Sequence, residues 1–251
     1  MINDNETSVG KAYSALARFY EELAEKDGYE EWGDRVLALA KKYSQGKKCA
    51  DLACGSGFFT RKLKKGGFDV FGCDISDEML VEAQKKSAEQ GLSIEYRKQN
   101  LASFISFEKL DIVTVINDGF NYLEGKKFKK AISAISKNLK KGGVLIFDVS
   151  SAYKLRNVIA DNLFAEDLDE LTYLWFNELS GDKLTMSLTF FIKHGDKYVR
   201  KDEVHVQYIH ELDFIKSVLK ENSFEIAELF GKNQDEILDT DERWNFVAIK
   251  K

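Results

Sequence analysis

Residues 48–60 read Lys48-Cys49-Ala50-Asp51-Leu52-Ala53-Cys54-Gly55-Ser56-Gly57-Phe58-Phe59-Thr60, a short apolar strand that leads into a glycine-containing turn and the start of a helix. Gly55 and Gly57 let the backbone turn sharply and approach a ligand closely, because neither carries a Cβ. The helix that follows presents its free N–H groups to whatever lies in the turn. A second apolar strand, residues 68–73, leads into Asp74, 23 positions after Asp51. A carboxylate meets the ribose of a bound nucleotide at an offset of about 20 residues, so the stretch predicts a nucleoside-binding βαβ unit.

The glycine spacing distinguishes between kinds of nucleotide. A dinucleotide fingerprint needs a third Gly or Ala so that a pyrophosphate can lie on the helix, and Thr60 stands there instead. This disfavours a nicotinamide-dependent oxidoreductase. The turn resembles motif I of the class I S-adenosylmethionine-dependent methyltransferases, acid-x-Gly-x-Gly-x-Gly, which is read here as Asp51-x-Ala53-x-Gly55-x-Gly57. Ala53 replaces the first glycine, and we expect its methyl group to be accommodated by a φ angle below zero.

Composition and charge narrow the class of protein. The chain has 251 residues, of which 44% are hydrophobic, enough for one large domain with a full core. Its net charge of −5 argues against a general nucleic-acid binder, which would carry a basic balance. The sequence has neither a basic-then-apolar leader nor an apolar run of 18 residues, and its three cysteines fit reduced core residues. We therefore expect a cytoplasmic protein with no nucleic-acid partner, no membrane partner and no metal site.

Two amphipathic helices are predicted before the first strand, over residues 10–24 and 29–43. Together they make an N-terminal segment, residues 1–46, that resembles the lid of small-molecule methyltransferases such as the glycine N-methyltransferase-like and aminosugar N-methyltransferase-like enzymes. That resemblance implies that Tyr20, Tyr29 and Trp32 close over the methyl donor. Aromatic residues at helical spacing are usually core residues, so packing between lid and sheet is an equal alternative for each of them.

The donor-binding core is predicted over residues 47–150, and the resemblance implies further contacts in it. Ile75 follows the acid, and Met79 lies one turn into the next helix, so both match positions that pack on adenosine in the family. The third strand, residues 93–99, leads to Asn100 and Leu101. The family has Asp where Asn100 stands, accepting a hydrogen bond from the adenine amino group, and the carbonyl oxygen of Asn can also accept.

A fourth strand is predicted over residues 111–116, where a β-branched apolar run is typical of a central parallel strand. Ligands in such sheets bind outside the carboxyl ends of the strands, so the loop Asn117-Asp118-Gly119-Phe120-Asn121-Tyr122 is the first place to look for chemistry. Asn117 is assigned to the donor there. A helix over residues 125–140 and a fifth strand ending at Asp148 follow.

The alternation of strands and helices then stops. After a short helix over residues 151–163, three alternating stretches, residues 171–179, 183–193 and 197–209, predict a three-stranded antiparallel meander within an insertion spanning 165–210. The middle stretch has one wholly apolar face, which must be covered by the domain, by a substrate or by a second subunit, so a homodimer through the insertion is possible.

Residues 211–251 close the chain with a helix over residues 211–222 and two strands over 224–230 and 243–249. In the family these strands form a reversed edge pair. The predicted fold is therefore α/β, a single domain over residues 1–251 with a Rossmann-like sheet. That sheet has seven mostly parallel strands with helices on both faces, its last strand is reversed, and the meander is inserted after the fifth strand.

The resemblance implies S-adenosyl-L-methionine as the cofactor and S-adenosyl-L-homocysteine as the product. Asp51 and the turn backbone at Ala53, Gly55 and Gly57 would hold the methionine part, and Asp74 the ribose diol. The expected activity is methyl transfer to a small-molecule acceptor, with an amine nitrogen as the first choice. O-methylation and a non-catalytic S-adenosylmethionine-binding or dimerisation module remain as alternatives.

Three side chains are candidates for helping an amine nucleophile to arrive neutral. Tyr122 ranks first, because aminosugar N-methyltransferases have a polar ring at the aligned position. Asp118 lies in the same loop. His205 is predicted on the last strand of the meander, where an ordinary cross-strand residue is the more frequent case.

Overall fold

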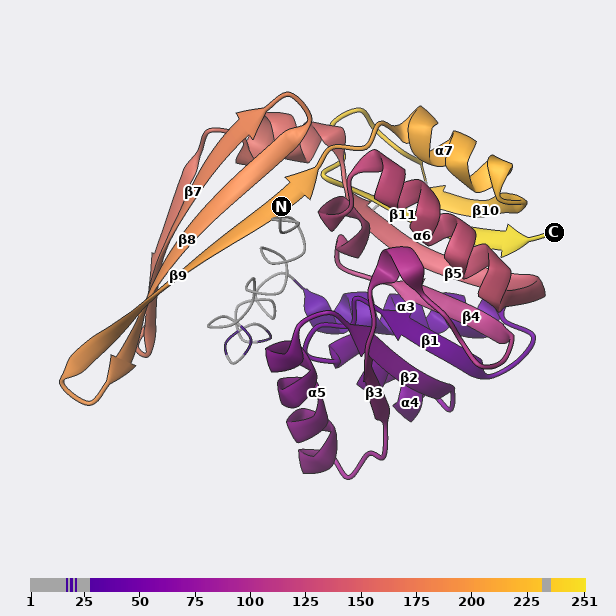
Figure 1. The fold of residues 1–251 in the computed structure, drawn as a ribbon, viewed down its shortest axis with the longest axis horizontal. Helices are drawn as coiled ribbons and strands as arrows, with labels where there is room; N and C mark the ends of the chain where they lie inside the picture. The colour runs from indigo at the N-terminus through magenta and orange to yellow at the C-terminus, as the bar shows by residue number, and fades with distance from the viewer. Residues whose placement is uncertain (1–16, 18, 20, 22–27, 232–235) are drawn as a thin grey trace, which may run out of the picture.

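The computed structural model describes residues 17, 19, 21, 28–231 and 236–251. Two sheets organise these residues, a large sheet flanked by helices and a long twisted ribbon of strands beside it (Figure 1). Most of the first predicted helix, including Tyr20, lies outside the described residues. None of the helices within the described residues has both the length and the apolar character needed to cross a lipid bilayer.

The large sheet has seven strands in the order β10-β11-β5-β4-β1-β2-β3, with β1 near its middle. The strands are β1 (Lys48–Leu52), β2 (Asp69–Asp74), β3 (Glu95–Lys98), β4 (Leu110–Val115), β5 (Leu139–Ser150), β10 (Phe224–Phe230) and β11 (Arg243–Lys250). β11 runs antiparallel to both of its neighbours, β5 and β10, whereas the pairs from β5 to β3 are parallel. The prediction of a Rossmann-like sheet with a reversed last strand is confirmed.

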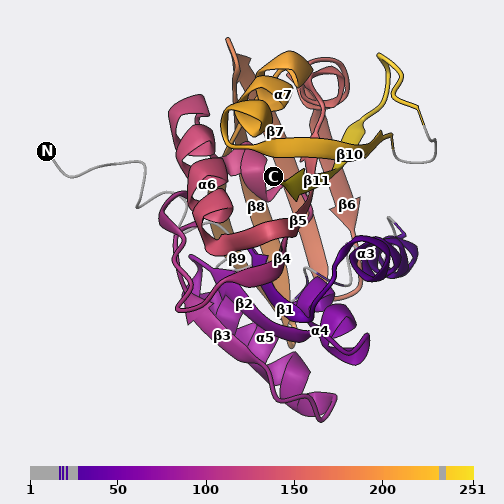
Figure 2. The same ribbon diagram turned by 90° about the vertical axis from the view of Figure 1, so that its right-hand side faces the viewer.

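Helices cover both faces of this sheet (Figure 2). They are α3 (Tyr29–Tyr43), α4 (Phe58–Lys65), α5 (Asp77–Glu89), α6 (Gly125–Asn138) and α7 (Leu212–Glu221), with short 3₁₀ turns η1 (Leu101–Ser103) and η2 (Gly119–Tyr122). Successive side chains of a strand point to opposite faces, so β5 serves two cores. Leu145 and Phe147 pack on the α6 and α7 side, and Val144 and Ile146 on the α3 and α4 side.

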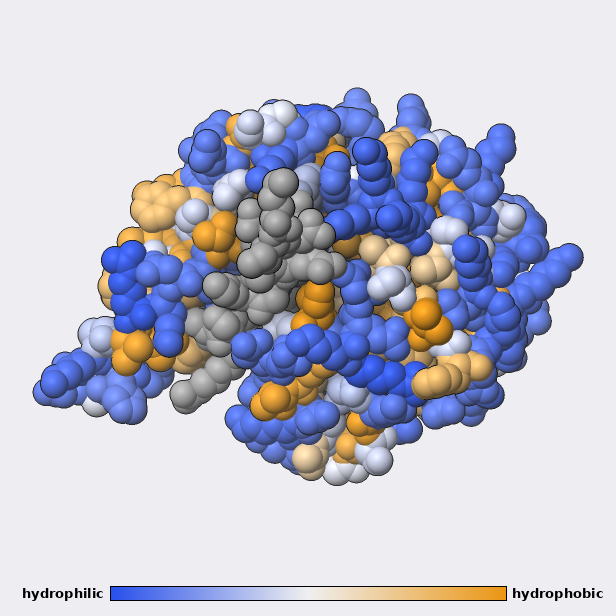
Figure 3. All heavy atoms as spheres, in the orientation of Figure 1, coloured by the Kyte–Doolittle hydropathy of each residue, from blue (hydrophilic) through white to orange (hydrophobic). Residues whose placement is uncertain are grey.

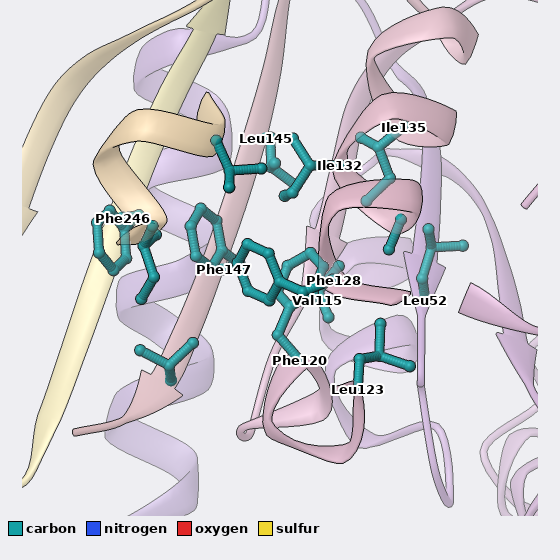
Figure 4. Close-up of a cluster of buried hydrophobic side chains, with 14 of the residues drawn as sticks. Leu52, Val115, Phe120, Leu123, Phe128, Ile132, Ile135, Leu145, Phe147 and Phe246 are labelled. Carbon is teal, nitrogen blue, oxygen red and sulfur yellow. The ribbon is translucent and has the colours of Figure 1, made fainter. Parts of the chain in front are cut away.

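The core on the α6 side is built from aromatic and branched side chains that close the loop after β4 onto the sheet (Figure 4). Phe120 of η2 is fully buried between Phe128 of α6 and Phe147 of β5, with ring centroids 4.9 and 5.1 Å away. Phe246 of β11 stacks on Phe147 at 4.5 Å. The side chains beneath the loop after β4 are therefore closely packed.

The second sheet leaves the large one after β5. A π-helical turn, η3 (Lys154–Ile159), replaces most of the helix expected over residues 151–163. Four antiparallel strands follow in the order β6 (Leu163–Asp167), β7 (Leu171–Ser180), β8 (Lys183–His194) and β9 (Lys197–Tyr208). The three predicted strands are present, and β6 is an additional strand. It was missed because its five residues, Leu163–Asp167, run from apolar to acidic without the alternation expected of a strand, although their burial alternates in the structure.

The apolar face of β8 is covered in part by the protein itself. Leu184 and Met186 join the main core, and Phe190 packs against Phe19 and Leu171. On β9, the side chains that face the large sheet are polar but buried, namely Glu203, His205 and Gln207. The outer surface is mostly hydrophilic, with apolar side chains visible over the ribbon of β7 to β9 on the left of Figure 3.

Candidate active site

A pocket of about 1150 Å³, open solvent at its mouth included, lies at the carboxyl ends of β1, β2, β3 and β4. This is where ligands bind in open α/β sheets. The residues proposed from sequence that line it are Asp51, Ala53, Gly55, Asp74, Ile75, Met79, Asn100, Leu101, Asn117 and Tyr122. Four others, Gly57, Trp32, Asp118 and His205, are described but are not among the lining residues.

The turn after β1 is left-handed at three positions. Gly55 and Gly57 have φ angles of 53° and 79°, and a Cβ on Gly57 would lie 2.4 Å from the hydroxyl of Tyr96. Ala53 has a φ angle of 51°, so the expected negative value is wrong. An L-residue pays about 1–2 kcal/mol for this conformation. Its methyl group faces Gly119, where a built Cβ would lie only 2.9 Å away, so the strained turn is packed closely against the loop after β4.

Asp51 is a buried carboxylate at the end of β1, 1% exposed. The hydroxyl of Thr60 donates to its Oδ2 at 2.5 Å, and that of Thr114 donates to its Oδ1 at 2.7 Å. Burial raises its pKa to about 6, against the lowering effect of the two hydroxyls, and the nearby charge of Asp74 raises it further. A carboxylate with so little solvation is stabilised by a cation placed beside it.

Asp74 ends β2 and lies across the turn from Asp51. Its Oδ2 accepts the N–H of Gly55 at 2.8 Å, and its Oδ1 accepts the N–H of Ser76 at 2.9 Å. Burial raises the pKa of this carboxyl group, and these backbone N–H groups oppose the rise. Each ionised oxygen can accept about two hydrogen bonds, so the carboxylate has acceptor capacity left for a ligand.

Apolar side chains form the wall beside Asp74. Met79 is held in the first turn of α5, because Ser76 caps that helix by accepting the N–H of Met79 at 3.2 Å. Ile75 and Leu101 line the pocket with it. Asn100 caps the 3₁₀ turn η1, since its Oδ1 accepts the N–H of Ala102 at 2.8 Å.

The loop after β4 contains two successive left-handed residues that are not glycine. Asn117 and Asp118 have φ angles of 66° and 53°. Their N–H groups donate to the two oxygens of Asp148, at 2.6 and 2.9 Å, and Arg243 forms an ion pair with the same carboxylate. Gln207 of β9 donates to Oδ2 of Asp118 at 2.5 Å, so the side chain of Asp118 is turned toward the second sheet.

Tyr122 follows in η2 and lines the pocket. Its hydroxyl lies 3.2 Å from Nδ1 of His205, and Nε2 of His205 lies 3.1 Å from Oε2 of Glu203. The side chains of His205 and Glu203 are 4% and 0% exposed. A buried chain of three titratable groups therefore starts at the pocket and runs into the second sheet. Glu203 was not predicted as a site residue, and the only signal for it is the period of two that places it on the same face of the strand as His205.

The aromatic residues of α3 have separate positions. Tyr29 lines the pocket, and its hydroxyl accepts the side-chain N–H of Asn117 at 3.1 Å. Trp32 lies behind it, with its ring 4.3 Å from the guanidinium of Arg243. Further lining residues went unnoticed as site residues in the sequence, among them Ser56, Phe58 and Phe59. Their signal was their position, Ser56 between the two glycines of the turn, and Phe58 and Phe59 at the start of the helix that opens directly after Gly57.

These residues fit S-adenosylmethionine. A Cβ built on Gly55 would contact only Met79, at 3.9 Å, so the bare backbone leaves room for a ligand. Asp74 supplies acceptors for two hydroxyl groups, Asp51 a carboxylate for an ammonium group, and the apolar wall a surface for a flat base. Among the described residues, no group of three or more His, Cys, Asp or Glu side chains is arranged to hold a metal ion.

Comparisons with known proteins agree with this chemistry. A family model described as a methyltransferase domain matches residues 49–143. A Geobacillus protein described as a methyltransferase is 35% identical over 245 residues, which cover 95% of this chain and 99% of the relative. The crystal structure of an S-adenosylmethionine-dependent methyltransferase from Clostridium acetobutylicum has a TM-score of 0.87 at 31% identity and covers 95% of this chain and 98% of its own.

More distant structures share the fold. The amino pentose methyltransferase CalS10 from Micromonospora echinaspora, solved with S-adenosylmethionine bound, has a TM-score of 0.70 at 17% identity, covering 90% of this chain and 91% of its own. The pocket has two carboxylates placed for this donor, and the relatives match the chain almost end to end. The chain therefore belongs to the S-adenosylmethionine-dependent methyltransferases.

Proposed function

We propose that this enzyme transfers the methyl group to an amine nitrogen of a small molecule. The observation that supports this is the chain from Tyr122 through His205 to Glu203, which begins at the pocket. An amine is protonated near neutral pH and has no lone pair to attack with until the proton is removed. Bound S-adenosylmethionine supplies an electrophilic methyl group on a sulfonium, so the task left to the protein is to orient and deprotonate the nucleophile.

The three side chains can move one proton in a defined direction. When Nε2 of His205 carries a proton and donates it to Glu203, Nδ1 is left as an acceptor for the hydroxyl of Tyr122. An ammonium group at the pocket end gives a proton to the oxygen of Tyr122, and the hydroxyl proton passes to Nδ1. The imidazolium that forms lies beside the carboxylate of Glu203, which stabilises it.

The acidity of the nucleophile favours an amine over an alcohol. Free alkylammonium groups titrate near ~10.4, within reach of general-base help near neutral pH. An aliphatic alcohol loses its proton only at much higher pH. The same relay could assist a phenol, which titrates near ~10. O-methylation is therefore the second candidate, limited to acidic hydroxyl groups.

The residues that we assign to donor binding follow strands of the large sheet. We assign the ribose hydroxyls to Asp74, the base to the wall of Ile75, Met79 and Leu101, and the methionine ammonium to Asp51. These assignments are supported by the position of the Asp74 carboxylate on the pocket wall and by the scarcity of solvent around Asp51. Asn117 and Tyr122 then lie between the donor and the second sheet, which is where an acceptor would enter.

The test is S-adenosylhomocysteine release from matched pairs of acceptors, each pair an amino sugar or alkylamine and its hydroxyl counterpart. We expect turnover with amines, and a loss of roughly 10²-fold in that turnover for His205→Gln. The control variant is His194→Gln, because His194 lies at the exposed end of β8, away from the pocket. Turnover with hydroxyl compounds alone would replace this proposal with O-methylation.

We also propose that the enzyme is a cytoplasmic homodimer joined through the second sheet. Its three cysteines are buried and free, which supports a reducing compartment. Leu163 and Phe176 pair across β6 and β7 and are 57% and 49% exposed, and Val204 of β9 is 47% exposed. Light scattering should give twice the chain mass for the wild type and the single mass for Phe176→Glu.

A further inference from the structure

We propose that Asp148 and Arg243 are positioning residues for methyl transfer, because together they hold the loop after β4 in the conformation that completes the donor pocket. Asp148 lies at the end of β5 and Arg243 at the start of β11, strands that pair antiparallel. Neither residue lines the pocket, so both act through residues that do.

The loop after β4 needs contacts from other parts of the chain to keep its conformation. Asn117 and Asp118 are both left-handed, which L-residues adopt at a cost, and two such residues in succession are not stable by themselves. Successive N–H groups in such a segment point the same way and make an anion-binding concavity. In this protein the anion is a side chain, since the two oxygens of Asp148 accept the two N–H groups at 2.6 and 2.9 Å.

The guanidinium of Arg243 forms an ion pair with that carboxylate and favours its ionised form. Asp148 is fully buried, and burial raises its pKa, an effect that Arg243 opposes. Nη1 of Arg243 donates to Asp148, and Nη2 donates to Oδ1 of Asn117 at 3.3 Å. The Trp32 ring lies against the guanidinium, so the cation is clamped from the α3 side as well.

Asp148 and Arg243 position the loop after β4, which lies between the donor pocket and the second sheet. Asn117 and Gly119 line the pocket, and Asn117 also reaches the pocket aromatic Tyr29. Asp118 is tied to Gln207 of β9, on the same strand as His205. A loop released from Asp148 would lose both connections, so binding of the donor would have to order the loop again.

The experiment measures the dissociation constant of S-adenosylhomocysteine by calorimetry and the melting temperature of each variant. Asp148→Asn replaces one of the two acceptor oxygens with an NH₂ group, which cannot accept a hydrogen bond from the loop. We expect it to raise the dissociation constant about tenfold and to lower the melting temperature. The matched control is Asp111→Asn at the opposite end of β4. Asp111 also accepts a backbone N–H, from Lys48 at 3.0 Å, and pairs with a cation, Lys140. This control should bind like the wild type.

A double variant separates positioning from stability. Asp148→Asn with Arg243→Gln removes the buried cation together with its partner, so the melting temperature should recover much of its loss. The loop still lacks its carboxylate, so the affinity for S-adenosylhomocysteine should stay low. If the affinity returns with the melting temperature, or if Asp148→Asn binds as tightly as Asp111→Asn, the pair is structural and the proposal is overturned.

Discussion

Asp74→Ala tests the assignment of the donor pocket most directly. The carboxylate accepts the N–H groups of Gly55 and Ser76, and its oxygens have acceptor capacity left for a ligand. If its two oxygens bind the ribose hydroxyls of the donor, the substitution removes two hydrogen bonds to a charged group. It leaves β2 and the start of α5 with their own hydrogen bonds and packing.

The size of the effect follows from those two bonds. A hydrogen bond to a charged group contributes about 1.5–3 kcal/mol, so two at the lower end amount to ~3 kcal/mol. Since 1.4 kcal/mol is tenfold, the dissociation constant of S-adenosylhomocysteine should rise by about 10²-fold, and by no less than tenfold. The free energy of unfolding should change little, because two effects oppose each other. The variant leaves two N–H groups without an acceptor, but it also removes a carboxylate whose pKa is raised by burial.

Calorimetry with S-adenosylhomocysteine measures this change, and Asp77→Ala is its control. Asp77 stands three residues later, in the first turn of α5, and its side chain is 67% exposed. The control should bind like the wild type, and both variants should melt within a few degrees of it. If Asp74→Ala titrates like Asp77→Ala, the carboxylate does not bind the ribose and the donor assignment has to be rebuilt.

Three other predictions follow from named residues. Affinity for S-adenosylhomocysteine should rise with pH up to about 6 and then level off, because an ammonium group binds ionised Asp51, whose pKa is about 6; calorimetry from pH 5 to 8 that gives a constant affinity contradicts this. Tyr122→Phe should lower turnover by roughly 10²-fold with nearly unchanged donor affinity; a stable variant with full turnover excludes a role for the hydroxyl. Ala53→Gly should raise the melting temperature by about 2–4 °C in calorimetric scans, because it relieves about 1 kcal/mol of left-handed strain; a lower melting temperature means that the lost methyl contact outweighs the strain.

The large sheet could be predicted from sequence because each part of it has a local signal. Residues 111–116 are an almost continuous apolar run, as is typical of a central strand. The helix predicted over residues 29–43 begins and ends at Tyr29 and Tyr43 in the structure. Asp51 and Asp74 were found in the same way, since each comes at the end of a predicted strand. Strand ends of a parallel sheet meet at one edge, so both reach one pocket.

The parts that escaped prediction depend on contacts between distant positions. Asp148 and Arg243 are separated by 95 residues, and only the reversed pairing of β5 and β11 brings them together. The left-handed φ angle of Ala53 accompanies its close approach to Gly119, 66 residues away in the chain, and no local preference of alanine signals it. Trp32 and Tyr29 lie three residues apart on one helix, and the tertiary position of that helix decides that Tyr29 lines the pocket and Trp32 lies behind it.

The second sheet has a consequence for how this enzyme can evolve. It begins after β5 and returns before α7, so it is one continuous insertion, whereas the donor residues all precede it in the chain. Hydrogen bonds from β9 link it to the loop after β4, through His205, Gln207 and the backbone carbonyl of Tyr208. Substitutions on β9 that keep Gln207, and with it the contact to Asp118, can therefore change which acceptor is recognised without disturbing the donor residues. A graft of residues 163–206 from a relative, which leaves Gln207 and Tyr208 in place, should transfer acceptor preference and leave the affinity for S-adenosylhomocysteine as it was.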